Sequence, residues 1–165
     1  MKNNKESKFK NMNPYEQKLK QYLQDKNIPA EHLSFDASCH SVADAAKALN
    51  ANPDEFIKNI CLIDQDDNLI VAIVKGEDKV DSKAIAEVLG ISEPKICRPE
   101  QILEKSGYPV GGTPSFGYSA IFLVDPRVIE KEIVYSGGGS PTSVLKIQTS
   151  ELLKANQAKV VKIRK

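Results

Sequence analysis

Two apolar runs in the middle of the chain constrain its fold more than any other feature of the sequence. Residues 60–63 read Ile-Cys-Leu-Ile, and residues 69–74 read Leu-Ile-Val-Ala-Ile-Val. Short apolar runs that are rich in β-branched residues are typical of buried strands. The residues between them, 64–68, are polar and predict a connection longer than the tightest hairpin turns. We therefore expect a buried β-hairpin at this place.

Short helices and strands follow one another irregularly on both sides of this hairpin. Apolar spacing, caps and stops predict helices that begin at Pro14 and end before Asn27, and at 41–49, 82–89, 99–106 and 150–154, with a short turn at 52–55. Further strands are expected at 32–35, 95–97, 119–124, 132–135, 144–147 and 159–163. Because there is no regular strand–helix–strand repeat, the pattern predicts the α+β class with a curled mixed β-sheet.

The length and composition are typical of one compact domain. The chain has 165 residues, of which 41% are hydrophobic, and we expect a single domain over residues 13–165. Residues 1–12 are basic and polar without periodicity, so we interpret them as a flexible tail. No apolar stretch reaches the roughly 18–20 residues of a membrane span, and the polar start lacks the apolar core of a secretory signal. These features favour a cytoplasmic protein without a membrane partner.

Charge and cysteine content argue against several classes of function. Lys and Arg number 23 and Asp and Glu 22, so the net charge of +1 gives no global argument for nucleic-acid binding and leaves only a local basic patch open. The three cysteines, Cys39, Cys61 and Cys97, are widely spaced, which is typical of reduced thiols in a cytosolic protein. Since only His32 and His40 add further ligands of that kind, we expect no metal site.

Two glycine-rich loops are the strongest candidates for a binding site. Residues 111–117 read Gly-Gly-Thr-Pro-Ser-Phe-Gly, and residues 136–141 read Ser-Gly-Gly-Gly-Ser-Pro. Glycine lets the backbone approach a ligand closely, and proline stiffens the same loop. Neither loop has the Walker A pattern or the Gly-x-Gly-x-x-Gly spacing, so we expect no nucleotide cofactor. Their unhindered N–H groups can instead bind an anion or a developing oxyanion.

The sequence contains no evident nucleophile paired with a base. It has no Gly-x-Ser-x-Gly motif, so a hydrolase built on this chain would position water and substrate without a covalent intermediate. Lys58 stands where a short turn enters the first core strand, so its ammonium is a candidate cation at the mouth of a cleft, with an ordinary solvated lysine as the alternative. Asp125 closes a strand beside Pro126, and the pattern is compatible with a turn cap or a functional carboxylate.

Several segments, taken in order, resemble a known family. They are HSVADAAKALNANPDEFIKNICLID (40–64), LIVAIVKGEDKVDSKAIAEVLG (69–90), GYPVGGTPSFG (107–117), IFLVD (121–125) and YSGGG (135–139), followed by LKI and ELL. Over roughly residues 32–155 the chain is similar to the YbaK/prolyl-tRNA-synthetase-associated editing family. The resemblance implies a curled, barrel-like mixed β-sheet flanked by short helices. It also implies hydrolysis of the ester between a wrong amino acid, such as Ala, Cys or Ser, and the 3′ end of a tRNA.

The resemblance assigns roles to individual residues. Lys58 falls on the family's pocket lysine, which is expected to engage the terminal adenosine phosphate or the aminoacyl ester. The N–H groups of Gly111 and Gly112 are expected to hold the aminoacyl carbonyl, so these three residues are the candidate catalytic groups. The candidate substrate-binding residues are Phe35, His40, Asn59, Thr113, Pro114, Phe116, Gly117, Asp125, Ser136 and Gly137.

At some positions this chain departs from the family's pattern. Asn59 stands where the family often has Thr, and the order Thr113-Pro114-Ser115 shifts the usual proline of the loop. Residues 138–139 are glycines where the inserted editing domains carry a histidine. These departures leave open which amino acid is removed.

We therefore expect a trans-editing aminoacyl-tRNA deacylase that meets the 3′ end of a mischarged tRNA alone or with an aminoacyl-tRNA synthetase. No side-chain base is evident, and the resemblance implies that the ribose hydroxyl of the substrate positions or activates the water. A local lysine patch would dock the tRNA, with Lys58, Lys75, Lys79 and Lys83 as candidates. Two alternatives stay open: a non-catalytic module that binds an aminoacyl group, tRNA or a synthetase, and a hydrolase of a small ester unrelated to tRNA.

Overall fold

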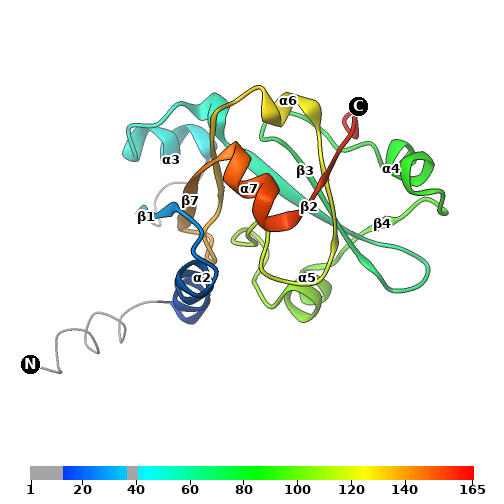
Figure 1. The fold of residues 1–165 in the computed structure, drawn as a ribbon, viewed down its shortest axis with the longest axis horizontal. Helices are drawn as coiled ribbons and strands as arrows, with labels where there is room; N and C mark the ends of the chain where they lie inside the picture. The colour runs from blue at the N-terminus through cyan, green and yellow to red at the C-terminus, as the bar shows by residue number, and fades with distance from the viewer. Residues whose placement is uncertain (1–12, 37–40) are drawn as a thin grey trace, which may run out of the picture.

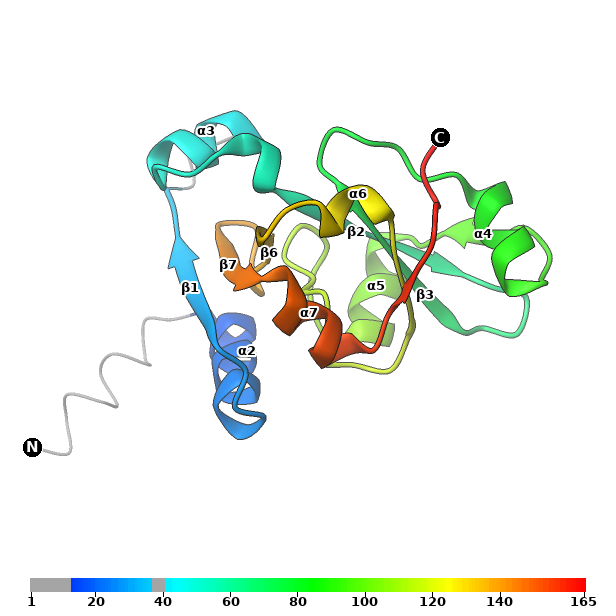
Figure 2. The same cartoon turned by 45° about the horizontal axis from the view of Figure 1, so that its top comes forward.

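The computed structural model describes residues 13–36 and 41–165, and within them the chain forms two β-sheets with helices around them (Figures 1 and 2). The helices are α2 (Pro14–Asp25), α3 (Val42–Ala48), α4 (Ser82–Leu89), α5 (Pro99–Ser106), α6 (Pro126–Ile129) and α7 (Thr149–Asn156), with a 3₁₀ helix η1 (Pro53–Glu55). The tail expected at residues 1–12 and the candidate residue His40 lie outside the described residues.

The larger sheet is built on the predicted hairpin. Strands β2 (Ile57–Ile63) and β3 (Leu69–Lys75) pair antiparallel over their whole length, and β4 (Lys95–Ile96) adds to the outer edge of β2. Strands β5 (Ile121–Val124) and β8 (Lys159–Val160) continue the sheet on the other side of β3 in the parallel direction. The sheet is therefore mixed, as expected from the irregular order of elements.

The second glycine-rich segment connects two strands of the smaller sheet. This sheet has the order β1 (Ala30–Ser34), β7 (Ser143–Gln148), β6 (Ile133–Gly137), and all its pairs are antiparallel. The two sheets meet where Phe56 forms a parallel bridge with Tyr135 and their rings stack with centroids 4.8 Å apart. The predicted α+β fold with a mixed sheet is confirmed, except that the strands form two sheets in contact and do not close into a barrel.

Most element ends follow the capping signals in the sequence. The side chains of Ser41, Asn52 and Asp81 each accept a hydrogen bond from a backbone N–H of the helix that follows them. Gly90 and Gly107 end α4 and α5 in the left-handed conformation that glycine adopts without steric cost.

Several elements differ from the expected ones, and three of these differences change the path of the chain. Asp125 and Pro126 do more than end a strand, because they start the short helix α6 with Asp125 as its cap. Strand β6 runs on through Ser136 to Gly137, since Gly137 still pairs with Val144 of β7. Strand β8 is shorter than expected: after Val160 the chain turns toward α6.

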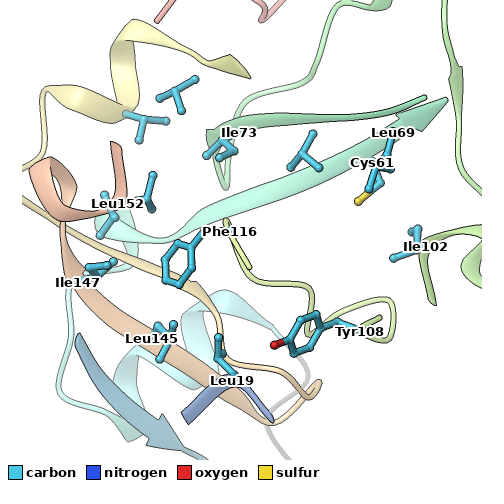
Figure 3. Close-up of a cluster of buried hydrophobic side chains, with 14 of the residues drawn as sticks. Leu19, Cys61, Leu69, Ile73, Ile102, Tyr108, Phe116, Leu145, Ile147 and Leu152 are labelled. Atoms are coloured by element: carbon cyan, nitrogen blue, oxygen red, sulfur yellow. The ribbon is translucent and has the colours of Figure 1, made fainter. Parts of the chain in front are cut away.

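The main hydrophobic core lies between the two sheets, α2 and α7. Figure 3 shows Phe116, from the first glycine loop, among Leu145 and Ile147 of β7 and Leu152 of α7. Phe116 is completely buried, which fixes this end of the loop in the core. A second cluster packs the other face of the β2–β3 hairpin against α4. No helix within the described ranges is long and apolar enough to span a membrane.

Candidate functional site

The structure brings the two glycine loops into direct backbone contact. The N–H of Gly139 donates to the carbonyl of Gly112 over 2.7 Å. A Cβ atom on Gly137 would stand 2.1 Å from the carbonyl oxygen of Thr113, and one on Gly112 would stand 2.5 Å from the backbone nitrogen of Ser140. Only glycine permits this approach, so the glycines serve the packing of one loop on the other.

Polar side chains from three parts of the chain meet beneath this contact. The Asn59 amide, on β2, donates to the Thr113 carbonyl over 2.8 Å. Ser115 Oγ donates to Asn59 Oδ1 over 2.8 Å and lies 2.6 Å from Ser136 Oγ. Ser115 and Ser136 are fully buried, so these hydrogen bonds are shielded from water. Asn59 thus ties β2 to the first glycine loop and to β6.

The next two carbonyl groups of the first loop are also held by side chains. Tyr118 Oη donates to the Pro114 carbonyl over 2.6 Å, and Asn156 Nδ2, at the end of α7, donates to the Ser115 carbonyl over 3.0 Å. Three successive carbonyls therefore have fixed partners on three different segments. A loop held in this way needs little reorganisation when a ligand binds.

A hollow of about 260 Å³ opens beside the contact of the loops. Four of the predicted site residues line it: Phe35, Gly111, Ser136 and Gly137. The other lining residues come from α3 and its cap, from the Phe56–Ile57 entry to β2, from the second glycine loop, and from β6 and β7, and none of the described lining residues is charged. The arrangement can hold a small uncharged group against backbone.

Gly111 offers this hollow an unused donor. Its backbone is in the left-handed region, with φ of +86°, and the residue is exposed. Within the ranges 13–36 and 41–165, the N–H of Gly111 has no hydrogen-bond partner. The adjacent Gly112 is buried, and its N–H donates to the Pro109 carbonyl over 3.1 Å. Of the two candidate oxyanion donors, Gly111 is therefore the one with a free N–H.

Lys58 follows two lining residues along the chain. It is the second residue of β2, opposite Val74, and it is half-buried. Because side chains alternate along an extended chain, Lys58 shares a face with Phe56, which lines the hollow, and Asn59 projects from the other face. Lys58 itself is not among the lining residues, and in the described part of the chain it has no hydrogen-bond or ion-pair partner. Its role in catalysis stays a prediction.

Asp125 does not line the hollow, and both of its carboxylate oxygens have hydrogen-bond partners. The residue is completely buried, and its carboxylate accepts from the N–H of Arg127, in the first turn of α6, and from that of Ile163. Arg164 pairs with it over 2.7 Å. These contacts correspond to the turn-cap alternative, extended to the C-terminal segment, and its role as a substrate ligand stays a prediction.

The remaining predicted loop residues support the loop from inside. Thr113 and Pro114 are buried, and Phe116 stacks on Tyr22 of α2 with ring centroids 6.0 Å apart. Gly117 has φ of +100° and faces the same Tyr22 ring. None of these four loop residues lines the hollow.

Lys75 is a buried ion-pair residue and does not belong to an exposed basic patch. It is only 5% exposed, contacts Asp54, and lies 3.2 Å from Glu77. Asp54 also contacts Lys131. The hydrogen bonds from these two lysines lower the pKa of Asp54 to about 2, so Asp54 stays charged at neutral pH. The expected docking patch therefore loses this member, whereas Lys79 and Lys83 are exposed.

Cysteine chemistry is not available in the described core. Cys61 and Cys97 are free thiols and both are buried. Burial raises the pKa of the Cys61 thiol to about 12 and also raises that of Cys97, so neither forms a thiolate near neutral pH. This agrees with an arrangement that positions water and does not use a thiolate nucleophile.

The sequence patterns did not indicate several residues whose side chains donate hydrogen bonds that fix the glycine loops. Ser115, Tyr118, His32 and Asn156 each bond to a loop or to Asn59, but only Ser115 lay inside a recognised motif. Asn156 is 41 positions from its partner Ser115, and no local pattern indicates such a contact.

Comparisons with known proteins agree with this geometry. The model of the aminoacyl-tRNA editing domain family matches residues 36–155, and the chain belongs to this family. The uncharacterized protein YwhH of Bacillus subtilis (strain 168) is 23% identical over 128 residues, which cover 76% of this chain and 81% of that protein.

Two solved structures share the fold. One, described as a "putative trans-editing enzyme for prolyl tRNA synthetase", superposes with a TM-score of 0.86 at 20% identity, over 93% of this chain and 99% of that one. The other, described as "hypothetical protein APE2540", superposes with a TM-score of 0.79 at 23% identity, over 90% of this chain and 99% of that one. At these identities the two structures establish the fold.

Proposed function

We propose that this protein is a trans-editing deacylase that hydrolyses the ester between an amino acid and the 3′-terminal ribose of a mischarged tRNA. The observation that carries the proposal is the hollow beside the two packed glycine loops, which has no charged residue among its described lining and is lined by Gly111, whose N–H has no hydrogen-bond partner among the described residues. Family membership supports the same activity. The substrates we propose are tRNAs charged with Cys, Ala or Ser, on tRNA-Pro or on another tRNA.

In the proposed reaction, water attacks the ester carbonyl carbon and the bond from that carbon to the ribose oxygen breaks. The carbonyl oxygen becomes an oxyanion, which the N–H of Gly111 stabilises. The neighbouring ribose hydroxyl positions the water, and the leaving ribose oxygen takes up the proton that the water loses. The products are a free amino acid and a tRNA with an intact terminal ribose.

Lys58 supplies the positive charge in this proposal. Its ammonium, without a partner among the described residues, pairs with the terminal adenosine phosphate and so fixes the ester against the loop. A charge of this kind strengthens binding and orientation of the reacting group.

Replacement of this lysine tests the proposal directly. We expect Lys58→Ala to lower the rate of amino acid release by about 100-fold or more, because one preorganised electrostatic contact is typically worth that much. Lys95→Ala is the matched control, since Lys95 is an exposed lysine on the edge strand β4, opposite Ile63 at the other end of β2 from Lys58. Wild-type turnover of Lys58→Ala on every tRNA that the wild type deacylates would exclude this role.

A non-catalytic binding module is the second candidate function. It is favoured by the absence of any carboxylate, imidazole or thiol among the described lining residues of the hollow. Such a module would bind an aminoacyl-tRNA or a synthetase and release no amino acid. Retained tRNA binding without release from any mischarged tRNA would select this candidate over the deacylase.

A further inference from the structure

The N-terminal segment 13–34 packs against the back of both glycine loops, although it precedes the residues that the family model matches. Lys18 Nζ donates to the Gly107 carbonyl over 3.2 Å, at the approach to the first loop. At the second loop, a Cβ atom on Gly139 would stand 2.9 Å from the carbonyl oxygen of Tyr15. The shape of the loops therefore depends on a segment outside the common domain.

One residue of this segment bonds to the loop that borders the hollow. His32, on β1, has its Nε2 atom 2.9 Å from the carbonyl oxygen of Gly138. Because a carbonyl only accepts, Nε2 must carry the proton and donate it. The His32 side chain is 6% exposed, so this hydrogen bond is shielded from solvent.

The Gly138 carbonyl and the Gly139 N–H are the two ends of one planar peptide group. His32 holds its oxygen, and its N–H donates to Gly112 over 2.7 Å. The hydrogen bond from His32 to the Gly138 carbonyl thus fixes the orientation of this peptide plane. That orientation in turn directs the Gly139 N–H toward the Gly112 carbonyl and so places Gly112. Gly111, whose N–H has no partner in the described part of the chain, directly precedes Gly112.

We propose that His32 is a positioning residue for the hollow, which acts through the Gly138–Gly139 peptide to place the first glycine loop. It does not line the hollow. Its effect on hydrolysis rests on the proposed function, whereas its effect on the loops does not. Two charged groups face the His32 ring: Glu16, whose Oε1 lies 3.4 Å from Nε2, and Lys20. The Nε2 atom carries a proton both in the neutral tautomer described above and in the imidazolium, so it can donate to Gly138 in either state.

Amide hydrogen exchange tests the role of His32 in the loops without any substrate. We expect His32→Leu to remove the protection of the Gly139 N–H, because the peptide is then free to rotate away from Gly112. His32→Gln should retain the protection, since a glutamine amide can donate at the place of Nε2. If His32→Leu does not fold, His32→Asn, whose amide is too short to reach Gly138, takes its place. Wild-type protection of Gly139 in His32→Leu or His32→Asn, or lost protection in His32→Gln, would overturn the proposal.

Kinetics test the consequence for hydrolysis. We expect His32→Leu to lower kcat by about tenfold or more with little change in KM, because a misplaced donor loses transition-state contact before it loses binding. His32→Gln should restore kcat. Ile85→Val, on the buried side of α4 in the second core cluster, is a control for a general loss of stability and should keep both constants. An equal loss of kcat in His32→Gln and His32→Leu would contradict the positioning role. If the wild type releases no amino acid, the proposed function is contradicted, and the hydrogen-exchange experiment alone then decides the role of His32.

Discussion

Residue 137 is a glycine because the backbone of the first glycine loop passes too close to it for a side chain, and not because its backbone conformation requires glycine. Its φ is not in the left-handed region, yet a Cβ there would overlap the carbonyl oxygen of Thr113. Gly76 is a useful comparison, because its φ is also ordinary and a Cβ there would stand 3.3 Å from the nearest atom, the Phe56 carbonyl oxygen. The two positions separate steric demand from backbone strain.

We predict that Gly137→Ala lowers the free energy of unfolding by about 1–3 kcal/mol, the usual cost of forcing an extra carbon into a packed interior. Gly76→Ala should cost less than about 1 kcal/mol, since only a small shift is needed. Urea denaturation of both variants measures the difference. Equal stability of the two variants would show that the loops are not packed as tightly as described.

At the level of elements, the end of α7 is joined to the first glycine loop. Asn156 Nδ2 donates to the Ser115 carbonyl, and its Oδ1 accepts from the N–H of Ala158 over 2.9 Å. One side chain therefore both supports the loop and forms the turn that leads into β8. The helix α7 is therefore hydrogen-bonded directly to the first glycine loop, although no residue of α7 lines the hollow.

Asn156→Asp separates these two functions, because the carboxylate keeps an acceptor for Ala158 and removes the donor to Ser115. We predict a loss of about 1–3 kcal/mol in the free energy of unfolding, since a buried carbonyl is left without its partner. Lys154→Ala, at an exposed position of the same helix, should change it by less than about 0.5 kcal/mol. Chemical denaturation compares them, and an unchanged midpoint in Asn156→Asp would exclude the bond to Ser115 as a stabilising contact.

At the scale of the whole molecule, much of the fold could be predicted from local patterns. The hairpin follows from apolar runs, and the helix ends follow from caps such as Asp81 and stops such as Gly90, because these signals act within a few residues. The split into two sheets could not be predicted, since it depends on the contact of Phe56 with Tyr135, far apart in sequence. The same holds for the site: the glycine loops were recognisable, but supports such as His32 act over distances that no local pattern encodes.

Stability should also depend on pH through His32. Burial, as the largest cause, lowers the pKa of His32 below its usual 6.5 in the folded protein. Between the lowered pKa of the folded protein and 6.5, His32 binds more protons in the unfolded chain than in the folded one. The contribution of His32 to the free energy of unfolding is therefore fully present above pH 6.5 and decreases as the pH falls below it. We predict that thermal unfolding followed from pH 7.5 to 5 shows this loss in the wild type. In His32→Gln the loss should be smaller, and an identical pH dependence in both proteins would contradict the assignment.

Release of amino acid by the wild-type protein is the most direct test of the central claim, that the hollow beside the glycine loops is a deacylation site. Purified protein is incubated with tRNAs that carry Ala, Cys or Ser, including mischarged tRNA-Pro, and free amino acid is measured over time. We expect rapid release from at least one mischarged tRNA, with a tRNA product that can be charged again because only the ester is broken. Release at the uncatalysed rate from every one of these tRNAs would contradict the central claim.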